Sequence, residues 1–98
     1  KGRNSAPTYY GDNASVSDSL IADGCTILGT VEHSILFRGV KVGAHTVVRD
    51  SILFQDTFTG DNVSLHCVIT DKNVVIRDGC VLSGDRNMPF YISKGKMV

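Results

Sequence analysis

The sequence has 98 residues, with ten Lys and Arg against ten Asp and Glu, and a formal net charge of zero. This length supports one domain with a modest core. Balanced charge without a basic run argues against a nucleic-acid partner held through phosphates, and no apolar stretch approaches the roughly 18 residues of a membrane span. We therefore expect neither nucleic acid nor membrane as a partner.

The residue usage favours strands over helices. Val and Ile together number 19, whereas Ala occurs four times and Glu once. β-branched residues suit strands, and strong helix formers are scarce. Three cysteines without a CxxC spacing indicate reduced thiols, so we expect a cytoplasmic protein.

In chain order, residues 1–9 carry no repeat, and the first residue is Lys1 rather than Met. We expect them to be a linker from a missing upstream domain. Residues 10–84 carry a repeat: blocks of 17 residues begin at Ser34, Ser51 and Val68, and a block of 15 begins at Ser19. Residues 85–98 are predicted to form a turn and a closing strand that covers an open edge.

Each block contains a shorter period. Anchors such as Val42, Val48 and Leu53 are six and five residues apart, and small or aliphatic side chains follow four positions after each anchor. We expect both sets to point inward. Positions one block apart then form apolar columns: Val31, Val48, Leu65 and Leu82; Ile35, Ile52 and Ile69; and Cys25, Val40, Thr57 and Val74.

A six-residue unit cannot bury its own apolar face, but stacking buries it. The sequence therefore predicts an all-β fold, a single-stranded parallel β-helix of hexapeptide repeats with about four to five coils. Gly-Asp-Asn and Asp-Gly segments fit its corners.

The candidate chemical groups form no catalytic constellation. We expect His33, His45 and His66 to be separate surface histidines, because no two share a column, and we predict no catalytic residue and no metal site. The alternative is a hexapeptide-repeat acyltransferase, in which a trimer binds acyl-CoA and a histidine such as His45 acts as general base. Cys25 and Cys80 are predicted to be buried hydrophobes.

Several motifs resemble one known family. ADGCTILG, SILFRGVKVG, ITDKNVVI and the closing YISKGKMV are similar to the C-terminal β-helix of bacterial glucose-1-phosphate adenylyltransferase (ADP-glucose pyrophosphorylase), and most of all to its regulatory-type subunit. The resemblance covers residues from about 7 to 98. It implies a left-handed coil and an assembly or regulatory role for this region.

The resemblance also implies what lies outside this chain. The parent would make ADP-glucose and pyrophosphate from ATP and glucose 1-phosphate for glycogen synthesis, with Mg and ATP bound in the missing N-terminal domain and no cofactor here. This region would catalyse nothing. Its partners would be that domain and a catalytic subunit, in a tetramer.

The closing strand carries one position that matches the family. The resemblance implies an effector-binding lysine at Lys94, and our hypothesis is that Lys94, with Arg38 or Lys41, contacts an anionic effector. The alternative is an exposed lysine that guards a strand edge. A third possibility is an assembly module of some other sugar nucleotidyltransferase.

Overall fold

The computed structural model describes residues 6–98, in which fifteen short strands form three parallel sheets of five strands. The first sheet contains β1 (Tyr9–Tyr10), β4 (Thr26–Ile27), β7 (Lys41–Val42), β10 (Phe58–Thr59) and β13 (Val75–Ile76). The second contains β2 (Ser15–Ser17), β5 (Thr30–Glu32), β8 (Val47–Arg49), β11 (Ser64–His66) and β14 (Val81–Ser83). The third contains β3 (Leu20–Ile21), β6 (Ile35–Leu36), β9 (Ile52–Leu53), β12 (Val68–Thr70) and β15 (Phe90–Ile92).

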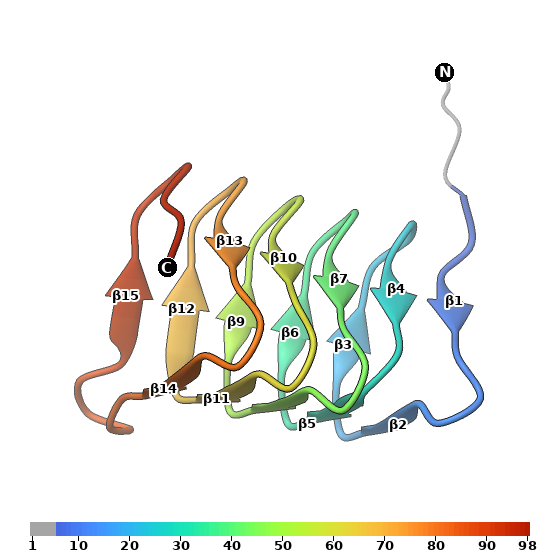
Figure 1. Cartoon of the computed structure of the whole chain (residues 1–98), viewed down its shortest axis with the longest axis horizontal. Helices are drawn as coiled ribbons and strands as arrows, with labels where there is room; N and C mark the ends of the chain where they lie inside the picture. Colours follow the sequence, from blue (N-terminus) through green and yellow to red (C-terminus); the bar gives the residue numbers. More distant parts are fainter. Residues whose placement is uncertain (1–5) are drawn as a thin grey trace.

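Consecutive strands belong to different sheets, so the chain winds as a β-solenoid (Figure 1). Each coil contributes one strand to each sheet, and the coils stack from β1 at one end to β15 at the other. Each coil has three corners. The first corner joins the first sheet to the second, the second corner joins the second sheet to the third, and the third corner leads from the third sheet to the first sheet of the next coil. Within the described residues, no helix is long and apolar enough to cross a membrane. The predicted parallel β-helix is confirmed.

The register of the sheets follows the sequence repeat. Ile35 pairs with Ile52 and Ile52 with Ile69, 17 residues apart, whereas Leu20 pairs with Ile35 across the block of 15. Two of the three predicted columns line the core: Val31, Val48 and Leu65 are at most 1% exposed, and so are Cys25, Val40, Thr57 and Val74.

The third predicted column points the other way, and this expectation was wrong. Ile35 is 37% exposed, and Ile52 and Ile69 are half-buried on the outer face. Ser34 and Ser51 turn inward instead. One left-handed residue turns the chain at the second corner before each of these isoleucines, so the inward positions on either side of it, such as Val48 and Ser51, lie three residues apart rather than four. The alternation of strand side chains then puts the isoleucines outside.

Both ends extend the solenoid beyond the predicted boundaries. Tyr9 pairs with Thr26, so the first coil begins before residue 10, and residues 1–5 of the predicted linker lie outside the described residues. At the other end, β15 pairs with β12 as a closing strand. The chain then turns at Gly95, and Met97 pairs with Val75 on the first sheet, so the predicted closing strand ends before the C-terminus.

Candidate functional site

The outer face of the third sheet carries an apolar groove of about 680 Å³. Its floor is the aliphatic column of Leu20, Ile35, Ile52 and Ile69, and the loop before β15 contributes Arg86 and Pro89. Leu20 is 69% exposed. A row of aligned aliphatic side chains gives this groove an apolar floor whose burial against a partner protein is favourable.

Polar side chains gather beside this groove at the second corner. Asp50 accepts two contacts: its Oδ1 lies 2.6 Å from Nδ1 of His33, and its Oδ2 lies 3.1 Å from Nε2 of His66. The hydrogen bond with His33, aided by the one with His66, holds the pKa of the Asp50 carboxyl below its ordinary value. Cys67 Sγ lies 3.8 Å from the same Nε2 of His66.

The backbone explains why these side chains meet. His33, Asp50 and Cys67 are the left-handed residues of the second corner on successive coils, with φ of 49°, 50° and 55°. His66 is the last residue of β11, one position before Cys67. We expected separate surface histidines, because His33 and His66 fall in different columns. The two columns are adjacent, and Asp50 joins their side chains.

The cluster does not form a nucleophile, base and acid relay. A relay would need one nitrogen of His66 toward Cys67 and the other toward Asp50, but both contacts involve Nε2. The cluster instead presents sulfur, nitrogen and oxygen atoms close together. Cys25 is buried in the core as predicted, whereas Cys80 is only partly buried and packs against it. Burial raises the pKa of the Cys25 thiol.

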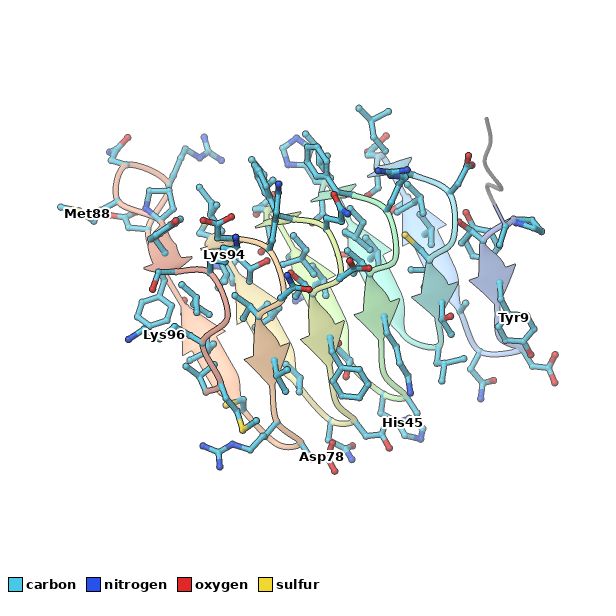
Figure 2. The ribbon with its side chains drawn as sticks, turned by 90° about the horizontal axis from the view of Figure 1, so that it is seen from above. Tyr9, His45, Asp78, Met88, Lys94 and Lys96 are labelled. Carbon is cyan, nitrogen blue, oxygen red and sulfur yellow. The ribbon has the colours of Figure 1, made fainter. Side chains whose placement is uncertain are left out.

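His45, the alternative general base, lies away from this cluster. It is exposed at the first corner, between β7 and β8. Figure 2 shows His45 and Asp78 along one edge of the stack, with Lys94 away from that edge. The three histidines therefore do not meet at one site.

The three predicted effector residues lie at different places. Arg38, at the third corner, lines a groove of about 290 Å³, and Lys41 on β7 holds its Nζ 4.9 Å from the centroid of the Phe58 ring. Lys94 belongs to the same corner as Arg38 but lies three coils further along. With adjacent strands about 4.8 Å apart, that separation is about 14 Å. One small anion cannot bridge Arg38 and Lys94.

A lysine that the sequence analysis missed neighbours Lys94. The amide of Gly95 donates to the carbonyl of Lys72, so Lys72 and Lys94 occupy adjacent coils at the third corner. Asp71 lies beside them, where it accepts hydrogen bonds from the Lys72 amide at 2.7 Å and from the Tyr91 hydroxyl at 3.1 Å. These hydrogen bonds, with the charges of both lysines, lower the pKa of Asp71. The loop before β15 makes the spacing from Val68 to its partner Phe90 22 residues instead of 17, and this change of frame hides the pairing of the lysines in the sequence.

Comparisons with known proteins agree with this architecture. The family model described as GlmU-like, C-terminal hexapeptide matches residues 6–95. Curated relatives named glucose-1-phosphate adenylyltransferase from Bacillus thuringiensis (strain Al Hakam), Bacillus mycoides (strain KBAB4) and Bacillus anthracis are each 37% identical over 95 residues. The match covers 95% of this chain and 25% of each relative, so the chain spans about a quarter of their length.

Proposed function

The chain belongs to the GlmU-like C-terminal hexapeptide family, and we propose that it is the C-terminal assembly and regulatory domain of a glucose-1-phosphate adenylyltransferase subunit. The observation that carries this proposal is the 37% identity to enzymes of that name over 95% of the chain. The motifs that resemble the regulatory-type subunit support the finer assignment. Three free cysteines support a reducing compartment, the cytoplasm.

The outer face of the third sheet supports an assembly role. The aligned aliphatic surface spans three coils and consists of Ile35, Ile52 and Ile69. About three quarters of each relative's length lies outside the matched region, and we infer that part of it covers this surface. We place the upstream nucleotidyltransferase domain on this face. Burial of the aliphatic column would then fix that domain against a stiff stack of coils.

The regulatory part of the proposal rests on the third corner. Lys72 and Lys94 on adjacent coils offer two ammonium groups to an anionic effector, and Arg38 with Lys41 offers a second cationic site two to three coils away. ATP, glucose 1-phosphate and Mg would bind the upstream domain. This region would therefore alter the rate without contacting the reacting atoms.

An activity assay tests the proposal. The intact subunit is assayed for ADP-glucose formation from ATP and glucose 1-phosphate, alone and mixed with the catalytic subunit from the same organism. Little activity alone and a clear rise in the partner's rate support the regulatory assignment. Strong activity alone overturns the regulatory type and leaves the enzyme family standing. No product and no effect on the partner, together with coenzyme A binding, replaces the proposal with an acyltransferase.

A charged substitution tests the docking face. Ile52→Lys places an ammonium group in the middle of the aliphatic column, and we expect it to weaken assembly in size-exclusion chromatography, because docking would bury that charge. Val47→Lys is the matched control, since Val47 is a half-buried outward residue of the same coil on the second sheet. Equal assembly of the two variants would remove the third sheet as the docking face.

A further inference from the structure

Three side chains with different metal-binding atoms meet at the second corner. The ligand atoms of Asp50, His66 and Cys67 all lie within 4.8 Å of one another. Nε2 of His66 lies 3.1 Å from Oδ2 of Asp50 and 3.8 Å from Sγ of Cys67. Neither the aliphatic groove nor the lysines of the third corner uses these atoms in the proposed function.

These separations fit the coordination of zinc. Bonds of about 2.0–2.1 Å to nitrogen or oxygen and about 2.3 Å to sulfur at tetrahedral angles put neighbouring ligand atoms about 3.3–3.6 Å apart. Both contacts of His66 Nε2 are close to that range. Zn²⁺ binds thiolate, imidazole and carboxylate ligands. Mg²⁺ and Ca²⁺ prefer oxygen ligands alone, so the sulfur and nitrogen atoms of this cluster favour zinc over them.

The backbone fixes two of the three ligands before any metal arrives. The amide of Asp50 donates to the carbonyl of Glu32, and the amide of Cys67 donates to the carbonyl of Arg49, each at 3.1 Å. These hydrogen bonds join successive coils. Nδ1 of His33, 2.6 Å from Oδ1, orients the Asp50 carboxylate and leaves Oδ2 toward His66.

The cation beside His66 on the neighbouring strand is paired with a carboxylate of its own. Arg49 pairs in register with His66, but its Nε lies 2.8 Å from a carboxylate oxygen of Glu32. Cys67 is 8% exposed, whereas His66 and Asp50 are open to solvent, so an ion can reach the site.

We propose that Asp50 Oδ2, His66 Nε2 and Cys67 Sγ bind one Zn²⁺, with His33 as the positioning residue of the carboxylate. Binding breaks the S–H bond of Cys67, and its proton passes to solvent as the zinc–sulfur bond forms. His66 binds as the neutral imidazole, with its proton on Nδ1. Three protein ligands leave the fourth position to water or to a small ligand, beside the groove that His33, Asp50 and Cys67 help to line.

Metal titration of the purified protein tests this site. We expect Zn²⁺ to bind with a stoichiometry of one in isothermal titration calorimetry. Co²⁺ is the spectroscopic probe, and we expect a thiolate-to-cobalt charge-transfer band together with the visible bands of a tetrahedral site. Because this spectrum is recorded on the unaltered protein, it does not depend on the folding of any variant. Absence of the charge-transfer band would overturn the assignment of Cys67 as a ligand.

Four variants locate the ion. Cys67→Ser and Asp50→Asn should abolish the one-to-one binding, and asparagine suits the left-handed backbone at residue 50. His33→Asn should weaken Zn²⁺ binding about 10- to 100-fold, because residues that hydrogen-bond a metal ligand and orient it typically contribute that much to the affinity. His45→Asn is the matched control, an exposed histidine with φ of 57° at another corner, and should bind as the unaltered protein does. Binding that survives Cys67→Ser, or that falls equally in His45→Asn, overturns the proposal.

Discussion

At the scale of single residues, left-handed backbone positions set the corners of each coil. His33, Asp50 and Asn62 have φ between 49° and 57°, a region that asparagine, aspartate and histidine tolerate better than other side chains. Cys67 also has a positive φ, of 55°, although cysteine is not among the residues that favour this region, so a thiol at this corner is unusual. The corner residues thus combine a backbone role with side chains that carry chemistry.

Protonation of Asp71 gives a prediction at this scale. Hydrogen bonds from the Lys72 amide and then the Tyr91 hydroxyl lower its pKa, and Tyr91→Phe removes the second. We expect the variant's Asp71 pKa to rise toward the ordinary value of 3.8. Carboxyl ¹³C NMR against pH measures this directly, with Tyr10→Phe as the control for loss of an exposed tyrosine hydroxyl.

The sign of the stability effect follows from the lowered pKa. The hydrogen bond from Tyr91 favours charged Asp71, so its contribution to folding is present above the unfolded-state pKa and is lost as the pH falls through the lower native value. The two proteins should therefore differ in free energy of unfolding near pH 5 and converge in stronger acid. The same Asp71 pKa in both proteins would contradict the prediction.

At the scale of elements, the corners rather than the two- and three-residue strands determine which side chains face inward. Buried hydroxyls link the second corner of one coil to the next: Ser34 Oγ accepts from the Ser51 amide and Ser51 Oγ from the Val68 amide, each at 3.1 Å. Gly29 lies in the first corner of the 15-residue block. This corner has two residues, whereas the same corner in the next coil has four, and this difference accounts for the shorter block. A Cβ at Gly29 would lie 2.2 Å from the carbonyl oxygen of Thr46.

The short corner gives a second prediction. Gly29→Ala must push the Thr46 backbone of the next coil away, because neither main chain can yield without breaking strand pairing. Gly79→Ala is the control: its φ of +76° is unfavourable for alanine, but open space surrounds it, so its cost is about 1–2 kcal/mol. We expect Gly29→Ala to lower the free energy of unfolding by more than Gly79→Ala, as measured by urea denaturation. Equal costs would mean that the corner relaxes freely.

At the scale of the whole molecule, the coils form a one-dimensional stack in which each coil contacts its neighbours. Such a stack leaves strand edges at its ends. β15 pairs with β12 at one end, and the pairing of Met97 with Val75 extends the cover to the first sheet. The C-terminal segment therefore protects edges that would otherwise pair with another chain.

Truncation tests this capping role. Ending the chain after Gly84 removes β15 and leaves β12 unpaired on one side, so we expect a lower melting temperature and concentration-dependent association in light scattering. Ending it after Ser93 keeps β15 paired and serves as the control. Equal association of the two truncated chains would show that β15 does not protect the edge.

Sequence periodicity predicted the architecture because the repeat is local. The 17-residue spacing, the buried columns that begin at Val31 and Cys25, and the closing strand were all readable from residue types along the chain. Prediction from the repeat failed where the spacing of inward positions changes. At the second corner this spacing is three residues, and the prediction wrongly put Ile52 inside. At the loop before β15 the longer spacing concealed the pairing of Lys72 with Lys94. The left-handed sense of the coil stays a prediction from the resemblance.

The sequence by itself determined the stacked coils, because apolar residues at a fixed period can be buried only when equivalent positions align. Only the tertiary structure decided which side chains meet across coils. Asp50 joins His33 to His66, and His66 approaches Cys67, because left-handed corners bring residues of adjacent columns together. The outward aliphatic groove has the same origin. Corner length sets the inward or outward phase of each strand, and a linear period does not record that length.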